Sequence, residues 1–555
     1  MDASASWLRT KIYGREMNMK KTIKILAIAM VLVLSVLAFV ACDFGVDFPF
    51  DGSNNNNTGN GNGNNNGGNG GSTGNNGGGT GNNGGSDGDG TINRTGTYTL
   101  DVYGINDLHG KFTDSAESNG QPGVDEMTTY LKQKAEAQNT VFLSTGDMWQ
   151  GSCESGLTKG NIITDWMNDL GFASMTLGNH EFDWGIDPIL DNIEIAEFPV
   201  LAINVYDYDT NQRLEGCEAS AVVDKGDLKV GIIGAIGDCY SSISADRVEG
   251  EVYFKTDDDL TALVKAEATR LREEEKVDFV IYSLHDGCTS SSSKIREFKG
   301  NLYNDEGDYY DLSLSDGYID LVFEAHTHQS YIVKDEHGVY HLQGGGDNKK
   351  GITHAEAVIN FDTGEVTVTP EIVYHNTYTA QAGDPIVDEL MEKYDSLVGT
   401  MNDSLGTNSM DRMSADLSNI VAKLYYEKGV EKWGSQYDII LGGGSINVRS
   451  PYNLYYGDIT YSMLYTLFPF DNEIVLCSIS GTNLKNRFIT NGSYVTYGYK
   501  DQNIVTNSNI RYYIVTDTWN SSYKENGLTI VDRYAEGVYA RDLLAEYAKE
   551  NKFLN

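Results

Sequence analysis

Five short segments of the chain carry carboxylate, amide or imidazole side chains, and each follows an apolar run. They read DLHG from Asp107, GD from Gly146, GNHEFD from Gly178, LHDG from Leu284 and AHTHQ from Ala325. Their seven candidate ligands are Asp107, His109, Asp147, Asn179, His285, His326 and His328. A single Asp after a strand is more often a turn or a helix cap, and a single His is more often structural. Five such segments in one chain indicate a site.

The donor types of these seven predicted ligands limit the chemistry. Carboxylate, amide and imidazole donors without thiolate suit hard or borderline divalent ions, namely Zn, Mn, Co, Fe or Ca. Seven donors exceed the need of one tetrahedral ion, so two ions that share one carboxylate fit better. Two ions about 3.5–4 Å apart activate a hydroxide and stabilise the entering and leaving oxygens of a displacement at phosphorus. The predicted reaction is therefore phosphoester hydrolysis.

The elements that must position these residues are short strands. Apolar runs such as TYTLDVYGI before Asp107 and VDFVIYSL before His285 alternate with helical or loop segments. This pattern predicts an α/β core whose strand ends line one edge. His326 and His328 stand at i and i+2, which places both on one face of an extended segment. Asp107 and His109 have the same spacing, so each pair is predicted to converge on one point.

The order of the five segments resembles that of the calcineurin-like metallophosphatases, and GNHEFDWG resembles the secreted 5'-nucleotidase and UDP-sugar hydrolase branch. The resemblance implies a four-layer α/β/β/α domain followed by a smaller α/β substrate-recognition domain. It also implies that Asp147 bridges two metals. The first metal would be held by Asp107, His109, Asp147 and His328, and the second by Asp147, Asn179, His285 and His326. Ala325 replaces the glycine usual in the last motif, which leaves both histidines in place.

Two further residues of GNHEFD have an implied catalytic role. The resemblance implies that His180 lies near the phosphoryl group, where it stabilises charge or protonates the leaving oxygen. Asp183 would orient its ring. The alternative for His180 is a packed histidine beside the site. Glu181 and Phe182 are interpreted as structural.

The later half of the chain resembles the domain that recognises substrate in 5'-nucleotidases. The segments on which this resemblance rests are GGGSINVRS, GDIT and PFDN. The family pattern implies that Arg449 binds an anionic group and that Phe470 and Trp519 stack on a base, with Arg412 as a second arginine. Gly444 stands where the family usually has Asn, and SSYKENG lacks the Asp that contacts the ribose. The alternative is that the aromatics belong to the core and Arg449 to a surface ion pair.

The length of 555 residues suits two domains with additional segments. The metallophosphatase domain is predicted over 96–375, a linker helix starting near Pro385 over 376–400, and the second domain over 401–555. The chain carries 80 acidic and 41 basic residues, which argues against nucleic acid as a partner. An anionic substrate must therefore be attracted by local cations, such as metal ions or placed arginines.

Residues 1–42 are predicted to be a signal and lipoprotein region, with the export signal itself starting near Met19. MKKTIK from Met19 supplies positive charge, and a long apolar run extends from Ile25 to Ala41. Translation is predicted to start at Met17 or Met19, which leaves residues 1–18 outside the signal. Cys42 follows AFVA and resembles a lipoprotein cysteine. A cleaved secretory signal and a retained membrane anchor stay open as alternatives.

An Asn/Gly-rich segment over 43–95 follows, and from Ser53 to Gly90 it contains no apolar residue. Such a segment cannot pack a core and is predicted to be a flexible tether spanning on the order of 35 Å. The five cysteines after Cys42 are odd in number and irregularly spaced, so they do not indicate a disulfide framework, although one or two pairs stay open.

The sequence thus predicts an exported, surface-tethered phosphohydrolase that acts on nucleotides with two divalent ions. A related phosphoesterase acting on cyclic nucleotides, nucleotide sugars or another substrate is the alternative enzyme. A surface binding or adhesion protein is the alternative of another class, and the intact set of ligands argues against it. Metal identity, substrate and oligomeric state stay open.

Overall fold

The computed structural model describes residues 94–113, 123–287, 318–335, 338–346, 351–378, 381–446, 448–449, 453–490, 492–498 and 504–554. Both predicted domains lie in the compact unit Gly84–Asn555. The predicted signal, Cys42 and the tether as far as residue 93 lie outside the described residues. None of the described helices is long and apolar enough to span a bilayer.

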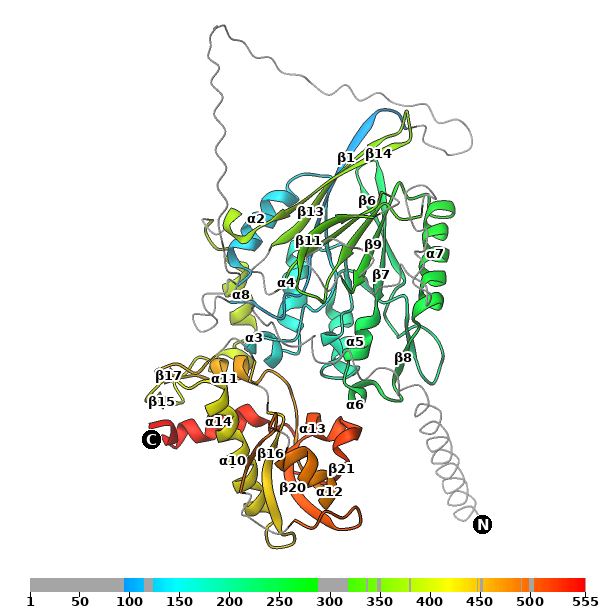
Figure 1. Cartoon of the computed structure of the whole chain (residues 1–555). Coiled ribbons are helices and arrows are strands. Elements are labelled where there is room, and N and C mark those ends of the chain that lie inside the picture. The colour runs from blue at the N-terminus through cyan, green and yellow to red at the C-terminus, as the bar shows by residue number, and fades with distance from the viewer. Residues whose placement is uncertain are drawn as a thin grey trace, which may run out of the picture. The chain divides into compact units, whose positions relative to one another are not determined.

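Two mixed six-stranded sheets form the first domain (Figure 1). The first has the order β14-β13-β1-β2-β3-β4 and the second the order β11-β12-β10-β9-β7-β6. The first sheet contains β1 (Thr97–Ile105), β2 (Thr140–Ser144), β3 (Ser174–Thr176), β4 (Val200–Leu201), β13 (Ile352–Asn360) and β14 (Glu365–Val373). The second contains β6 (Ser220–Lys225), β7 (Leu228–Ile236), β9 (Phe279–His285), β10 (Leu321–Glu324), β11 (Ser330–Lys334) and β12 (Tyr340–Gly344). A separate ribbon pairs β5 (Val205–Asp207) with β8 (Val252–Phe254).

Helices cover the outer faces of both sheets. The helices of this domain are α2 (Asp125–Ala135), α3 (Cys153–Leu157), α4 (Asn161–Leu170), α5 (Asp187–Ile195), α6 (Ala245–Val248) and α7 (Asp257–Glu273). Helix α7 illustrates how the sequence favours these elements, because its first turn is acidic and its last turn carries Arg270 and Arg272. Both features complement the helix dipole.

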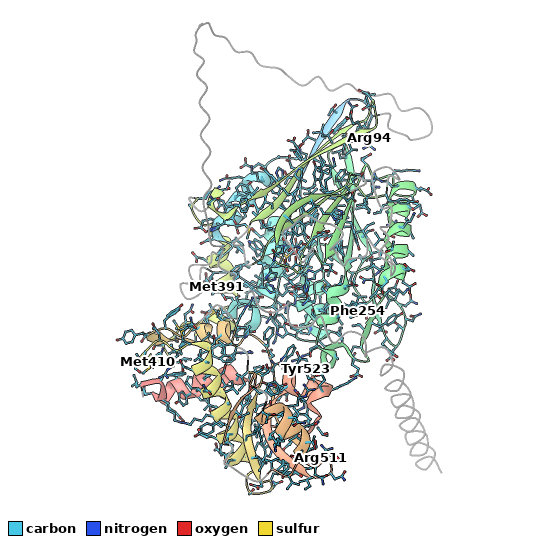
Figure 2. All side chains as sticks on the ribbon, viewed as in Figure 1. Arg94, Phe254, Met391, Met410, Arg511 and Tyr523 are labelled. Carbon is cyan, nitrogen blue, oxygen red and sulfur yellow. The ribbon has the colours of Figure 1, made fainter. Side chains whose placement is uncertain are left out.

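The hydrophobic core between the two sheets confirms the four-layer arrangement. Leu100 and Val102 of β1 pack there with Ile232 of β7 and with Phe279 and Ile281 of β9. Apolar residues of α2, α4 and α5 form a second core on the outer face of the first sheet. Residues of α7 form a third core on the outer face of the second sheet. Side chains fill the space between the ribbons of these layers (Figure 2).

Strand direction explains why the predicted ligands meet. Strands β1 to β4 run parallel, as do β7, β9, β10 and β12. The carboxyl ends of parallel strands share one edge of a sheet. The seven predicted ligands lie at or just beyond the carboxyl ends of β1, β2, β3, β9 and β10.

The segment between the domains is helical but interrupted. The predicted linker helix divides into α8 (Ile386–Lys393) and α9 (Asp395–Val398). Tyr394 breaks it, with backbone angles of φ −100° and ψ 12°. The hydroxyl of Tyr394 donates to Oδ2 of Asp165 over 2.5 Å, which fixes the break against the first domain.

The second domain is built on a five-stranded sheet with the order β19-β16-β20-β18-β21. Its strands are β16 (Ile439–Gly444), β18 (Ile474–Ser480), β19 (Val495–Tyr497), β20 (Arg511–Asp517) and β21 (Leu528–Arg533), and β15 (Gly406–Asn408) pairs separately with β17 (Gly457–Ile459). Its helices are α10 (Ser414–Trp433), α11 (Tyr461–Leu467), α12 (Gly481–Asn483), α13 (Thr518–Ser522) and α14 (Ala540–Lys549). Leu417 and Val421 of α10 pack on Leu476 and Val515 of the sheet.

Candidate metal centre and substrate site

One group of predicted ligands joins the ends of β1 and β10. The Nε2 atoms of His109 and His328 lie 3.0 Å apart. Nε2 of His328 also lies 3.5 Å from Oδ1 of Asp107. Ligand atoms of these three residues all lie within 4.8 Å of one another. The group corresponds to three of the four residues that the family resemblance assigns to the first metal.

A second group joins the ends of β2, β3, β9 and β10. Oδ1 of Asn179 lies 3.1 Å from Nε2 of His285 and 2.9 Å from Nδ1 of His326. Oδ2 of Asp147 lies 3.2 Å from Nε2 of His285. Asp107, Asp147 and His285 again offer ligand atoms within 4.8 Å of one another, so they connect the two groups. The structure thus brings all seven predicted ligands to one edge of the molecule's two sheets.

Backbone conformation, rather than an extended segment, makes the pairs converge. Asp107 and His109 have φ values of 49° and 50°, and His326 and His328 have 67° and 52°. The backbone of Asp147 is also in the left-handed conformation, with a φ of 54°. The prediction that each i, i+2 pair lies on one face of an extended segment is therefore wrong, because the strands have already ended. Residues other than glycine rarely adopt left-handed backbone angles. Where they do, the strained residues are often found at functional sites.

The buried carboxylate of Asp147 tests whether the residues fit metal ions. Asp147 is 1 % exposed, and its Oδ2 accepts no hydrogen bond from the described residues. A buried charged oxygen without a hydrogen bond is costly, and cations beside it, such as protonated His285 or a bound metal ion, reduce that cost. Oxygen and imidazole donors are also ligands that divalent ions accept. The residues therefore fit divalent ions, and Asp147 would be among the residues that hold them.

Charges within the cluster set the protonation of its histidines. Burial lowers the pKa of His326 to about 3, and the charge of His285 adds to this effect. Burial also lowers the pKa of His285, but the negative charge of the Asp147 carboxylate outweighs burial and raises the pKa to about 9. His326 is therefore neutral at pH 7 and carries the lone pair that a metal ligand needs.

Main-chain carbonyls orient two of the imidazole rings. The Nδ1 atoms of His109 and His285 donate to the carbonyl oxygens of Gln150 and Thr145, over 3.0 Å and 2.6 Å. With Nδ1 protonated, Nε2 is the nitrogen that would bind a metal. At His285, whose pKa is raised to about 9, a bound metal would displace the second proton from Nε2. Sequence reasoning missed these partners, since any residue type can supply a carbonyl.

Glu181 shapes the loop that carries Asp147. Its buried carboxylate accepts hydrogen bonds from the backbone N–H groups of Asp147, Met148, Trp149 and Gly178 over 2.7 to 3.1 Å. Four donors converging on one carboxylate hold two strand ends together. The interpretation of Glu181 as structural agrees with this arrangement.

His180 and Asp183 form a pair beside the ligands. Nδ1 of His180 lies 2.8 Å from Oδ2 of Asp183, and the backbone N–H of His180 donates to Oδ1 of Asp147 over 2.9 Å. The His180 ring centre lies 5.2 Å from that of His109. Asp183 therefore orients the ring through Nδ1, and Nε2 is the nitrogen that can exchange a proton with a substrate.

Comparison with known proteins agrees with this geometry. A model of the calcineurin-like phosphoesterases matches residues 100–330, and one of the 5'-nucleotidase C-terminal domain matches residues 398–529. The chain belongs to the 5'-nucleotidase-like metallophosphoesterases. It is therefore a phosphoester hydrolase, and the family implies divalent metal ions as its cofactors.

Relatives of this metallophosphoesterase match it across both domains. The chain is 28% identical over 432 residues to an apyrase from Tabanus yao, covering 70% of this chain and 73% of the apyrase. It is 25% identical over 458 residues to protein UshA from Yersinia enterocolitica, covering 72% of this chain and 79% of UshA. Its fold is similar to a 5'-nucleotidase precursor from Thermus thermophilus, with a TM-score of 0.58, 18% identity and coverage of 82% and 96%. A 5'-nucleotidase from Candida albicans has a TM-score of 0.53, 13% identity and coverage of 81% and 98%.

Two of the predicted substrate residues of this metallophosphoesterase, Phe470 and Arg449, interact with histidines of the site. The Phe470 ring is 39% exposed, and its centre lies 6.3 Å from that of His180 at an interplanar angle of 27°. The pKa of His109 lies well below its usual range, mainly because of burial, and the charges of His328 and Arg449 lower it further. The guanidinium of Arg449 therefore lies within electrostatic reach of the site.

The other two predicted substrate residues have different surroundings. The Trp519 ring packs edge-on against Tyr523, with the ring centres 5.1 Å apart. Arg412 donates from Nε to Oδ1 of Asn408 and from a terminal nitrogen to the carbonyl oxygen of Phe553, both over 3.0 Å. Arg412 therefore fastens the end of the chain to the second domain.

Sequence reasoning missed the residues that hold Phe470 in place. The guanidinium of Arg541, on α14, donates to the carbonyl oxygens of Phe468 and Phe470 over 3.1 and 3.0 Å and pairs with the Asp471 carboxylate. Lys159 of the first domain lies 2.6 Å from the other oxygen of Asp471. No local pattern marks Arg541, because its partners lie about 70 positions away.

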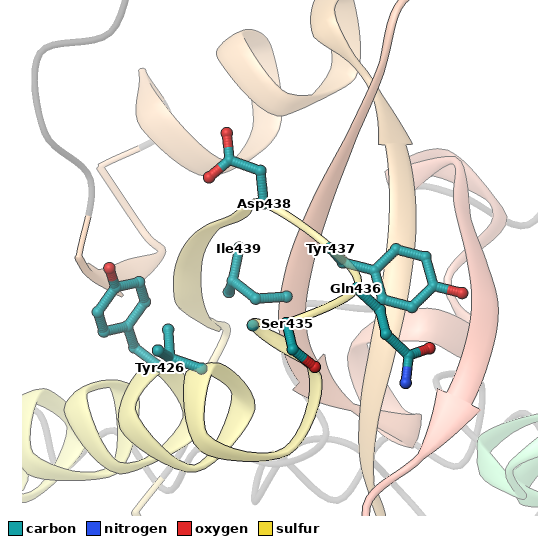
Figure 3. Close-up of a pocket in the computed structure, with 8 residues that line it drawn as sticks. Tyr426, Ser435, Gln436, Tyr437, Asp438 and Ile439 are labelled. Carbon is teal, nitrogen blue, oxygen red and sulfur yellow. The ribbon is translucent and has the colours of Figure 1, made fainter.

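A separate pocket of about 410 Å³ lies on the second domain (Figure 3). It is lined by Tyr426, Val430, Gly434, Ser435, Gln436, Tyr437, Asp438 and Ile439. No residue that the sequence assigns to chemistry lines this pocket.

Proposed function

We propose that this metallophosphoesterase removes phosphate from nucleotides at the site formed by the seven predicted ligands. The observation that carries the proposal is the position of the Phe470 ring, 6.3 Å from the ring of His180. His180 neighbours the metal ligands, whereas Phe470 offers a partly exposed aromatic face. A substrate with a phosphate at one end and a planar base at the other matches both features.

Each residue of the site would have a distinct task. The first ion would be held by Asp107, His109, Asp147 and His328, and the second by Asp147, Asn179, His285 and His326. When bound, the two ions supply positive charge and a nucleophilic water for displacement at phosphorus. Asp183 holds the His180 ring so that Nε2 can give a proton to the leaving oxygen or stabilise charge on the phosphoryl group. Arg449 adds positive charge that attracts an anionic substrate to this acidic protein.

A second candidate, a related phosphoesterase for cyclic nucleotides or nucleotide sugars, is favoured by one observation. A Cβ atom added to Gly444 would lie 2.6 Å from the side chain of Asn520. Asn520 therefore fills the space where the family pattern has an asparagine on the glycine-rich turn. Asn520 is held by hydrogen bonds to Ser445 and Asp517, so it does not move aside easily. The glycine-rich turn consequently differs from the family pattern, which leaves the specificity open to cyclic nucleotides or nucleotide sugars.

The proposal is tested by measuring phosphate release from nucleoside monophosphates, diphosphates and triphosphates with Zn, Mn, Co, Fe or Ca. Cyclic nucleotides, nucleotide sugars and sugar phosphates form the comparison panel. Fastest turnover on simple nucleotides supports the leading proposal, and fastest turnover on cyclic nucleotides or nucleotide sugars supports the second. Turnover on sugar phosphates alone contradicts both, because neither Phe470 nor Trp519 would then have a base to contact.

We further propose that the chain is exported and anchored to a membrane surface by lipid on Cys42. The support comes from the sequence, namely the basic and apolar segments before Cys42 and the polar tether after it. Mass spectrometry of the mature N-terminus tests the proposal, with a lipidated Cys42 as the expected result. An unmodified N-terminus further along the chain indicates a cleaved secretory signal, and an intact apolar segment indicates a retained anchor.

A further inference from the structure

Cys239 brings a thiol to the same edge as the metal ligands. It lies in the short helical turn Asp238–Ser242, which follows β7. Strands β7 and β9 pair in parallel with Ile236 opposite His285, so the turn begins beside the end of β9. The Cys239 thiol donates to the carbonyl oxygen of His285 over 2.8 Å. The thiol therefore lies against the backbone of a predicted ligand.

The sulfur atom is also within reach of two imidazole rings. Ligand atoms of Cys239, His285 and His326 all lie within 4.8 Å of one another. Cys239 is 5% exposed, so its sulfur is shielded from solvent beside these two rings. A donor of a different chemical type thus adjoins the half of the site that contains Asn179, His285 and His326.

The turn that presents Cys239 is held firmly. The backbone N–H of Asp238 donates to Oδ2 of Asp286 over 2.7 Å, and the hydroxyl of Ser242 donates to the Cys239 carbonyl oxygen over 2.7 Å. A Cβ atom added to Gly237 would lie 2.3 Å from Oδ2 of Asp286, so only glycine permits this close approach. The position of the sulfur is therefore fixed by the turn and not by chance packing.

We propose that Cys239 supplies a thiolate to the ion held by His285 and His326, which makes this position prefer thiophilic ions such as Zn²⁺ over Mn²⁺ or Ca²⁺. This inference rests on the proposed function, because it assumes that an ion binds there. On ligation the S–H bond breaks, a sulfur–metal bond forms and the proton leaves to solvent. The seven predicted ligands are all oxygen and nitrogen donors, so the thiolate gives the two metal positions different preferences.

Cobalt spectroscopy of the full chain tests the thiolate directly. A thiolate ligand adds an intense near-ultraviolet charge-transfer band to Co²⁺, whereas oxygen and nitrogen ligands give only weak visible bands. We expect the near-ultraviolet band in the wild-type protein and in Cys217→Ser, and its loss in Cys239→Ser with the visible bands retained. Cys217 is a suitable control because it is also buried, at 6% exposure, in the first domain.

Other spectra would overturn the inference in distinguishable ways. If the wild-type protein shows the visible bands without the near-ultraviolet band, then no thiolate binds the ion, whereas the two-metal proposal stays intact. This outcome is read from the wild-type spectrum alone. A near-ultraviolet band that persists in Cys239→Ser would show that another residue supplies the sulfur ligand. A wild-type protein that binds no cobalt overturns this inference together with the proposed function.

Metal competition provides a second readout. Zn²⁺ affinity, measured by competition with a chelator, is expected to fall by about tenfold or more in Cys239→Ser. This loss is at least as large as the one caused by removing a residue that is hydrogen-bonded to a metal ligand. Mn²⁺ affinity is expected to change much less. An unchanged ratio of Zn²⁺ to Mn²⁺ affinity would show that Cys239 only supports the backbone of His285.

Discussion

Oδ2 of Asp147 lies 3.2 Å from Nε2 of His285, yet it is buried and accepts no hydrogen bond from the described residues. The two residues lie at the ends of strands from different sheets, so the contact joins the two halves of the site. An oxygen in this position is suited to bridge two cations.

We predict that Asp147→Asn removes nearly all activity and lowers metal occupancy. The neutral amide cannot supply negative charge to two ions, and it also removes the negative charge that faces His285. Turnover and metal content of the purified protein measure both effects. Asp224→Asn is the control, because Asp224 is exposed on the edge strand β6. Near-normal turnover of Asp147→Asn with full metal content would contradict the bridging role.

His180→Ala should separate proton transfer from metal binding. Because the ring pairs with Asp183 next to the ligands, its removal is expected to lower turnover by roughly 10²–10⁴-fold while metal content stays unchanged. Asp183→Asn should lower turnover less, since the ring is retained but less well oriented. If His180→Ala loses metal, then His180 is itself a ligand and its assignment as acid or charge stabiliser is wrong.

Phe470→Ala and Trp519→Ala should affect nucleotides selectively. Each loss of ring stacking is expected to cost roughly 1–3 kcal/mol, observed mainly as a raised KM for nucleotides. Hydrolysis of a small phosphoester without a base should hardly change, and Tyr456→Ala, at a residue 73% exposed, serves as the control. Equal losses on both substrates would mean that the rings support the fold. No loss on either would place the base elsewhere.

Buried His341 predicts a pH dependence of stability. Burial lowers its pKa, but the carboxylates of Glu324 and Asp335 outweigh burial and raise it from 6.5 to about 9. Tyr331 completes the cluster by donating to Glu324. Because the pKa is higher in the folded chain, the stabilisation is fully present below pH 6.5 and is lost as pH rises through about 9.

The measurement is the free energy of unfolding of the wild-type protein and His341→Gln across this pH range. The difference between them is expected to be largest near the acid end and to shrink toward the alkaline end. A difference that stays constant with pH would mean that folding does not raise the pKa of His341.

The sequence predicted those features that local patterns determine. The segments around Asp107 and Asn179 follow apolar runs, so their arrival at strand ends in an α/β domain followed from the pattern. The left-handed backbone of His326 and His328 could not be predicted in this way, because spacing alone suggested an extended segment. Strain at such positions depends on the surrounding packing.

Contacts between distant segments were beyond the sequence. Cys239 lies 46 positions from His285, and only the parallel pairing of β7 with β9 brings them together. Asn520 fills the space beside Gly444 although it lies on a distant element, helix α13. A single sequence carries periodicity and turn signals, but it does not indicate which distant residues become neighbours.

We propose that two metal ions at the shared edge of the two sheets drive phosphate release from nucleotides. The most direct test removes metal by chelation, reloads the chain with Zn²⁺ or Mn²⁺, and measures bound metal and phosphate release from a nucleoside monophosphate in the same samples. We predict that activity disappears with the metal and returns as occupancy approaches about two ions per chain. Activity that survives complete removal of metal, or a fully loaded chain that releases no phosphate from any nucleotide, would contradict the claim.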